Sequence, residues 1–422
     1  MTDMKSLFIG KKRYIRTILF LVGIFFIFLD SYNILDIPLP WIGFIVCVLT
    51  CITNQIMHYR KLFWSMISLI CVLIITTYVG YDENSASLKF ILLRFTNIIG
   101  LVIIVNYFAN LDYESIKNSI LENNLINLGL FFSLVALIIL ILQIFNIHEI
   151  NIFDHLKNRL TTGAGENYSS KYNYNFDPQK FFYRASGTFR EPSLLVNALI
   201  LPFFLAIKNK KFFAILIIGL TIYLTYSLAI LAAILFGLIF SLLVIYRTKL
   251  FNKNFILCFI FFILSIYIFY KFGLFEKNVY GQRLLHLFEN DSRDYIYNNL
   301  DIILGNYLIG NGIGYGFFEL TQQIFGNRII PTSFLSVPLN FWSSGGIIGL
   351  LIISFWIFSH NIMTIIFFDK FNKTLYLLIT PLNIFLILYL SSFEELHIWH
   401  AIGLGFFLSY LKNFKKLKKL YD

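Results

Sequence analysis

One polar stretch interrupts a chain built mostly from Phe, Ile and Leu, and its residue types suit a charged substrate. It reads Arg184-Ala185-Ser186-Gly187-Thr188-Phe189-Arg190-Glu191-Pro192-Ser193. The guanidinium groups of Arg184 and Arg190 fit the oxygens of a diphosphate, because arginine bonds phosphate through parallel N–H groups. Glu191 is a candidate general base toward a hydroxyl group, and the ring of Tyr183 can stack on a sugar or anchor the segment at a membrane surface. We therefore expect chemistry on a lipid-linked diphosphate.

A second group of polar residues lies between positions 283 and 316. Asp291-Ser292 is a helix N-cap signature, so Arg293 falls in the first turn of a predicted helix, where free backbone N–H groups favour phosphate. Arg283 and His286 are three residues apart and share one face if that stretch is helical. Stretch 310–316 is rich in glycine but lacks the lysine of a phosphate-binding loop, so it predicts a tight re-entry into the membrane. Arg293 joins the catalytic candidates, and Arg283 and His286 are candidate substrate ligands.

Further ionisable residues lie in or beside apolar runs. Arg94 is inside one such run, where an arginine either serves function or extends its charge to the membrane surface. Glu394, His397 and His400 follow an i, i+3, i+6 spacing that suits proton transfer. A metal there would need a better-defined ligand geometry, so no metal or cofactor is expected. Glu394 and Glu395 are instead alternatives to Glu191 as the general base.

The composition indicates an all-α membrane protein. Hydrophobic residues make up 58% of the chain and charged residues only 14%. The apolar runs are long enough for helices that cross a bilayer, and none alternates as a barrel strand does. Run 212–246 would be about 52 Å long as one helix, so a hairpin near Thr225–Ser227 should divide it. Twelve spans are expected, at 17–35, 39–57, 62–80, 89–108, 125–145, 193–207, 212–227, 228–246, 255–275, 335–358, 374–391 and 397–411.

The distribution of Lys and Arg predicts the orientation of these spans. Basic residues gather at both termini and in alternate connections, which places both termini in the cytoplasm by the positive-inside rule. The net charge of +11 is then a topology signal, and the partner it indicates is a lipid bilayer rather than a nucleic acid. Two long connections, 146–192 and 276–334, lie on the outer face and carry the polar groups described above. The whole chain, 1–422, is one transmembrane domain.

Local signals around the first polar stretch predict how it meets the next span. Pro192 suits the first turn of a helix, whose positive end would face the substrate of Arg184, Arg190 and Glu191. Gly187 relieves backbone crowding on the approach to that helix. Residues 161–177, rich in Asn and Tyr, are interpreted as flexible cover.

These motifs resemble a known family of membrane enzymes. The stretch Arg184–Ser193, the Ser292-Arg293 helix leading to 310–316, and Ser333-Phe334-Leu335 before Gly345-Gly346 are similar to elements of bacterial O-antigen polymerases of the Wzy type. These belong to the O-antigen ligase and polymerase group of glycosyltransferases. The resemblance implies a GT-C-like fold in the bacterial inner membrane and an active site on the outer face. It also implies transfer of a growing glycan from polyprenyl (undecaprenyl) diphosphate to a new lipid-linked repeat unit, without a metal or nucleotide sugar.

One difference between this chain and the family favours one of the family's activities over another. Lipopolysaccharide ligases commonly carry a histidine before the re-entry, where this chain has Pro331-Thr332-Ser333. A polymerase of O-antigen or capsule is therefore favoured over a ligase. A flippase for the same lipid-linked oligosaccharide is the alternative from another class, although transporters place charges at the midplane and this chain places them in outer loops. Whether a chain-length regulator protein binds is left open.

Overall fold

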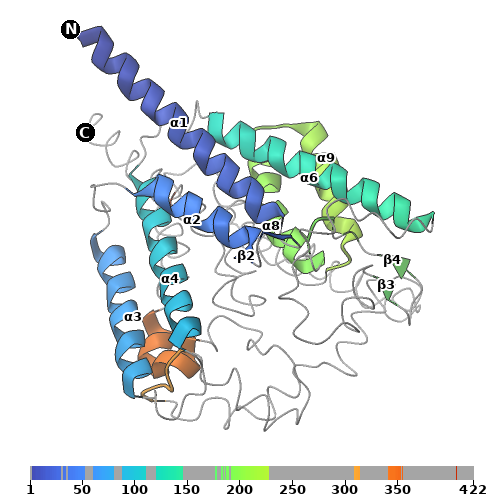
Figure 1. The fold of residues 1–422 in the computed structure, drawn as a ribbon. Coiled ribbons are helices and arrows are strands. Elements are labelled where there is room, and N and C mark those ends of the chain that lie inside the picture. Colours follow the sequence, from blue (N-terminus) through green and yellow to red (C-terminus); the bar gives the residue numbers. More distant parts are fainter. Residues whose placement is uncertain are drawn as a thin grey trace, which may run out of the picture.

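The part of the chain that the computed structural model describes is mostly helical (Figure 1). It comprises residues 2–29, 32–34, 37–52, 60–79, 88–110, 120–145, 176–177, 182–183, 185, 187–189, 192–227, 308–313, 341–352, 354 and 405. Its helices are α1 (Thr2–Phe28), α2 (Leu39–Cys51), α3 (Arg60–Val79), α4 (Leu88–Ala109), α6 (Ile120–Ile144), α8 (Pro192–Lys208), α9 (Phe212–Leu224) and the helix Phe341–Ile352. The all-α prediction therefore holds for the described residues.

Most described helices coincide with the apolar runs, and α1 differs most. The expected span 17–35 lies in a helix that starts at Thr2 and ends at Phe28. The helix extends into the basic N-terminus because lysine and arginine are good helix formers. Beyond it, β1 (Asn33–Ile34) pairs antiparallel with β2 (Ile37–Pro38), which takes residues 33–34 out of the predicted span.

One other expected span ends earlier than the apolar pattern suggests, and one apolar run is divided as expected. The span predicted at 39–57 is described as a helix only to Cys51, because Ile52 has an extended backbone (φ −63°, ψ 120°). The run 212–246 breaks where the sequence places its hairpin. Helix α9 ends at Leu224, and Tyr226 adopts a positive φ of 49°. The spans expected at 228–246, 255–275 and 374–391 lie outside the described residues, as does all of 397–411 except Gly405.

One described segment, Leu121–Leu142 of α6, is long and apolar enough by itself to cross a membrane. The other apolar helical segments in the described residues are 10–17 residues long. They are Ile15–Phe28, Leu39–Cys51, Met66–Val79, Phe95–Ala109, Leu194–Ile207, Phe212–Leu224 and Phe341–Ile352. The described part of the chain is thus mostly helical and contains one candidate membrane span.

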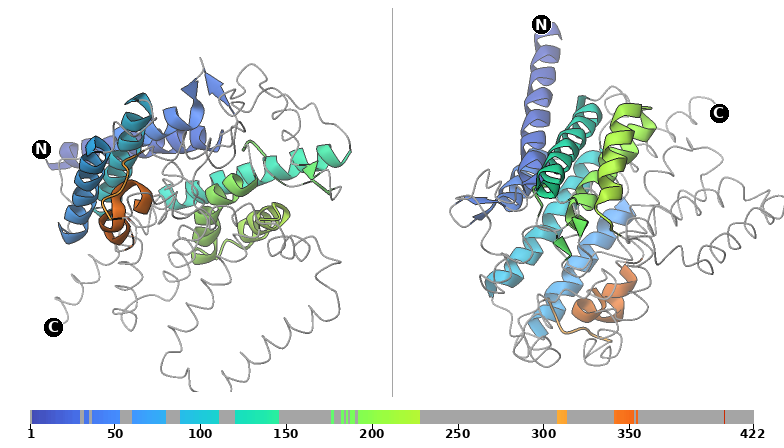
Figure 2. Two further views of the ribbon diagram at one scale, coloured as in Figure 1. Left: turned by 90° about the horizontal axis from the view of Figure 1, so that it is seen from below. Right: turned by 90° about the vertical axis from the view of Figure 1, so that its right-hand side faces the viewer.

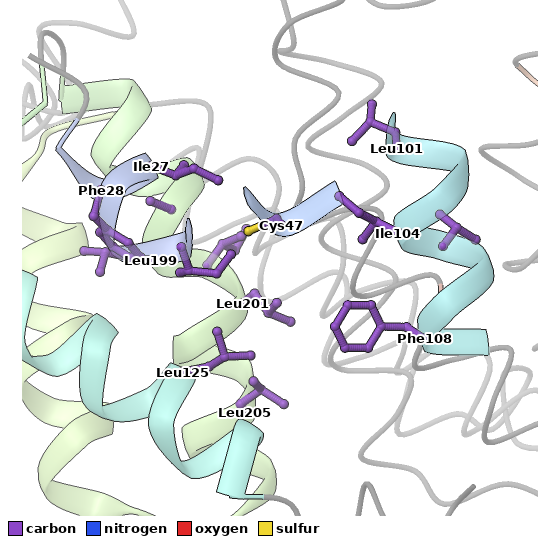
Figure 3. Close-up of a cluster of buried hydrophobic side chains, with 14 of the residues drawn as sticks. Ile27, Phe28, Cys47, Leu101, Ile104, Phe108, Leu125, Leu199, Leu201 and Leu205 are labelled. Carbon is purple, nitrogen blue, oxygen red and sulfur yellow. The ribbon is translucent and has the colours of Figure 1, made fainter. Parts of the chain in front are cut away.

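Apolar side chains from the described helices share one core, part of which is drawn in Figure 3. Phe28 of α1, Cys47 of α2 and Phe108 of α4 are fully buried, as are Leu125 of α6 and Leu199 of α8. Helix α6 also packs along α8 and α9. Helices α3 and α4 lie side by side, and the helix Phe341–Ile352 lies against them at the end of the molecule away from the N-terminus (Figures 1 and 2). The core therefore fixes the helix ends that surround the polar segments.

Hydrogen bonds define two opposite ends of the group formed by α6, α8 and α9. At one end the buried carboxyl of Glu122, in the first turn of α6, accepts a bond from the Asn209 side chain at 3.2 Å. Asn209 lies in the turn that joins α8 to α9, so α8 ends there and α9 begins there. At the other end α9 finishes at Leu224 and α8 begins at Pro192. The segment before Pro192 therefore lies at the end of these helices remote from the turn at Asn209.

Candidate functional site

One backbone N–H and one side-chain hydroxyl hold the motif segment, residues 183–192, to the ends of two helices. The Ala185 N–H donates to the carbonyl of Leu224, the last residue of α9, at 3.0 Å. The Thr188 hydroxyl donates to the carbonyl of Phe28, the last residue of α1, at 2.6 Å. Carbonyls in the last turn of a helix have no N–H partner within their own helix. The two donors from the motif segment supply such partners and so cap both helices.

Close packing adds a third helix to these contacts. Gly187 has a positive φ of 58°, and a Cβ placed there would lie 2.9 Å from the Cβ of Ala136 in α6. The ring of Phe189 is buried and meets the Phe28 ring edge to face, with centroids 5.8 Å apart. Phe28 in turn stacks on Phe132 of α6 at 4.4 Å. Residues 185 and 187–189 of the motif segment are therefore held against α1, α6 and α9.

The elements on either side of the motif segment are regular. Before it, β3 (Phe176–Asp177) pairs antiparallel with β4 (Phe182–Tyr183), and Tyr183 is opposite Phe176. This short ribbon includes residues 176–177, the end of the stretch interpreted as flexible cover, so these two residues are paired in a strand, and the cover itself stays a prediction. After the motif segment, α8 begins at Pro192, as predicted. The described residues 185 and 187–189 thus lie in sequence between a hairpin and the N-terminus of a helix.

The structure places some of the predicted site residues and leaves others outside its described part. Tyr183 lies in β4 and Arg94 in the second turn of α4, with side chains that are not described. Outside the described residues are Arg184, Arg190, Glu191, Arg283, His286, Arg293, Glu394 and His397. Described neighbours flank three of them, since Ala185 follows Arg184 and Phe189 precedes Arg190 and Glu191.

The second long connection contains a described stretch, the glycine segment Leu308–Ile313, which bonds the helix Phe341–Ile352. Asn311 N–H donates to the Ser343 carbonyl at 2.8 Å, and the Asn311 side chain donates to the same carbonyl at 3.2 Å. Gly312 N–H donates to the Ser344 carbonyl at 3.0 Å, and Ile347 N–H donates to the Leu308 carbonyl at 3.3 Å. In an uninterrupted helix the carbonyl of Ser343 would pair with the N–H of Ile347. Here both groups bond the glycine segment.

Glycines make this junction possible. Gly310 and Gly312 have φ of 92° and 83°, and Gly346 in the helix has φ of 62°. A Cβ on Gly346 would collide with the backbone of Leu308 and Ile309. The residues from Gly310 to Ile313 are buried. The glycine segment therefore packs tightly among helices, as the predicted re-entry requires, and its depth in a membrane is still a prediction.

Three polar residues that carry these contacts cannot be recognised from the sequence alone. Thr77 of α3 accepts a hydrogen bond from Ile313, Thr188 donates to Phe28, and Asn311 bonds Ser343. A threonine in or near a helix usually bonds its own backbone, as Thr76 and Thr96 do. Thr188 and Asn311 lie inside stretches that the sequence singles out, whereas nothing in the sequence around Thr77 draws attention to it.

Within the described residues no group of three His, Cys, Asp or Glu side chains could hold a metal ion. The cluster of Glu394, His397 and His400 lies outside them. Comparison of the chain with protein-family models, with curated proteins and with solved structures finds no match in any of the three. The function is therefore inferred from the residues of this chain and from where its described segments lie.

Proposed function

We propose that this chain is a membrane glycosyltransferase that polymerises a surface polysaccharide, an O-antigen or a capsule. It would transfer the growing glycan from undecaprenyl diphosphate to a new lipid-linked repeat unit. The observation that carries the proposal is the fixed motif segment. Ala185, Gly187, Thr188 and Phe189 are held by α1, α6 and α9, and the residues next to them in sequence are Arg184, Arg190 and Glu191. A rigid backbone is what a site needs to hold charges at fixed positions.

The proposed reaction breaks one bond and forms one. The bond between the anomeric carbon of the growing glycan and the diphosphate breaks, and an acceptor hydroxyl of the new repeat unit forms the glycosidic bond. Arg184, Arg190 and Arg293 would neutralise the departing diphosphate. Glu191 would take the proton of the acceptor hydroxyl, and Glu394 is the alternative base. Tyr183 would stack on a sugar ring. No metal or cofactor takes part in this scheme.

The proposed membrane arrangement has twelve spans, both termini in the cytoplasm and the site on the outer face of the bacterial inner membrane. Two observations support it. Lys210 and Lys211 lie in the exposed turn between α8 and α9, which basic residues would place in the cytoplasm. The motif segment lies at the opposite ends of the same two helices, next to Leu224 and before Pro192. A substrate on the outer leaflet would reach it there.

A transporter of lipid-linked oligosaccharide is the second candidate, and the helix interrupted at Gly346 is the feature to weigh for it. Transporters use interrupted helices whose freed backbone groups line a substrate site. In this chain the backbone groups of Ser343 and Ile347 bond the glycine segment instead. That arrangement is a packed junction, so we rank the polymerase first.

A single preparation separates the two candidates. Purified protein is incubated in detergent, where no membrane gradient exists, with a lipid-linked repeat unit, and product lengths are measured. The same preparation in liposomes is assayed for movement of the lipid-linked repeat unit between leaflets. A polymerase lengthens the glycan in detergent. Movement in liposomes without any lengthening in detergent would contradict the polymerase and favour the transporter.

A further inference from the structure

The Thr188 hydroxyl joins two parts of the chain that are far apart in sequence. It lies 160 residues from its acceptor, the Phe28 carbonyl, and the distance of 2.6 Å is at the short end for an O–H···O bond. We propose that Thr188 is a positioning residue of the transferase site, and that its hydroxyl fixes Arg190 and Glu191 by holding the motif segment to the end of α1. This inference rests on the proposed function.

The acceptor suits this role. Phe28 is the last residue of α1, and the carbonyls of a last turn carry the negative end of the helix dipole and need donors from outside the helix. Phe28 is fully buried and the hydrogen bond from Thr188 is partly buried, which limits competition from water for the hydroxyl. A hydrogen bond that is shielded from water restrains its partners more strongly than an exposed one.

The restraint at Thr188 extends to the charged residues because only a short stretch of chain separates them from Thr188. Arg190 is two residues and Glu191 three residues after Thr188, so their α-carbons lie within about 7 Å and 11 Å of it. A misplacement of about 1 Å at a reacting group can lower a rate by roughly a hundredfold. Loss of the Thr188 hydrogen bond would therefore lower the rate at the site, although Thr188 itself does not contact the substrate.

Loss of the hydroxyl should leave the rest of the anchor in place. Phe189 keeps its edge-to-face contact with Phe28, and Ala185 keeps its bond to Leu224. Valine has the shape of threonine without the hydroxyl. Thr188→Val is thus expected to fold, and its defect is expected in the motif segment alone.

The test compares full-length wild type, Thr188→Val, Thr188→Ser and Thr50→Val in the same detergent. Thr50 is a matched control because it is also partly buried, and its hydroxyl donates to the Cys47 carbonyl of its own helix, at 2.8 Å. Hydrogen exchange is measured on peptides covering residues 183–191. The lengthening assay gives kcat and KM for the lipid-linked repeat unit.

We expect exchange in residues 183–191 to be roughly tenfold faster in Thr188→Val, with kcat lowered by about ten- to a hundredfold and KM little changed. Thr188→Ser should restore both values, and Thr50→Val should match wild type. Unchanged exchange in Thr188→Val would overturn the anchor, and faster exchange with a normal kcat would overturn the positioning role. Equal defects in Thr188→Val and Thr188→Ser would show that the hydroxyl is not responsible. A wild-type protein that lengthens nothing would contradict the proposed function itself, and the exchange comparison would then decide the anchor alone.

Discussion

The hydroxyl of Thr77 accepts a hydrogen bond from the buried backbone N–H of Ile313 at 3.0 Å, across 236 residues of sequence. The same hydroxyl donates to the Leu73 carbonyl one turn earlier in α3 at 2.6 Å. It therefore acts as donor within its helix and as acceptor for the glycine segment. Through this one side chain the end of α3 is joined to the second long connection, which carries Arg293 in its sequence.

Removal of the Thr77 hydroxyl should destabilise the protein. Thr77→Val takes an acceptor from the buried Ile313 N–H, and loss of such a bond costs about 1 kcal/mol or more. Thr76→Val is the matched control, because the buried Thr76 hydroxyl bonds only the Leu73 carbonyl of its own helix, at 3.2 Å. Thermal unfolding in detergent should show a lower Tm for Thr77→Val than for Thr76→Val. Equal Tm values would mean that the link to Ile313 contributes nothing.

The neighbouring glycines of the helix Phe341–Ile352 should respond differently to alanine. Gly346→Ala puts a Cβ on a residue with φ of 62° and into the backbone of Leu308 and Ile309, so we expect a loss of at least about 1–2 kcal/mol. At Gly345 a Cβ meets only the Leu73 side chain, at 3.3 Å, and the Val72 side chain, at 3.6 Å. The measurement is the yield of monodisperse protein and its Tm. A Gly345→Ala variant as damaged as Gly346→Ala would argue against the junction.

The sequence predicts the helices well because their signals are local. Apolar runs, the proline at 192 and the basic turn at 208–211 act over a few residues, and α8 begins at Pro192 as expected. The break after Leu224 follows from length, since one helix could not fit the whole run. The N-terminal extension of α1 could not be predicted from the apolar run, because the length of that run does not show where a helix begins in the basic residues before it.

The contacts of the candidate site could not be read from the sequence. The bonds from Thr188 to Phe28 and from Thr77 to Ile313 depend on helices that are distant in sequence and close in space. Threonine is common, and no local pattern says which one will bond outside its own helix. The charges of Arg184 and Arg190, in contrast, follow from the residue types alone. The sequence therefore indicates the chemistry but not the contacts that hold these residues in place.

The turn between α8 and α9 and the first long connection should face opposite sides of the membrane. In a chain whose native cysteines are replaced by alanine, Lys211→Cys reports on the exposed turn and Ser170→Cys on residues 146–192. A membrane-impermeant maleimide added from the outer side of the membrane should label Ser170→Cys and spare Lys211→Cys until the membrane is opened, because basic turns stay cytoplasmic. Labelling of Lys211→Cys before the membrane is opened would reverse the proposed orientation.

The central claim is that the charges beside the fixed motif segment act on a diphosphate-linked glycan. The most direct measurement is the glycan length distribution made in detergent by wild type, Arg184→Ala, Arg184→Lys and Arg159→Ala. Arg159 is a control from the same long connection, outside the motif segment. The account predicts long glycans from wild type and Arg159→Ala. It predicts at least about a hundredfold slower lengthening from Arg184→Ala and a strong defect in Arg184→Lys, which cannot form a bidentate contact. A wild-type length distribution from Arg184→Ala would contradict it.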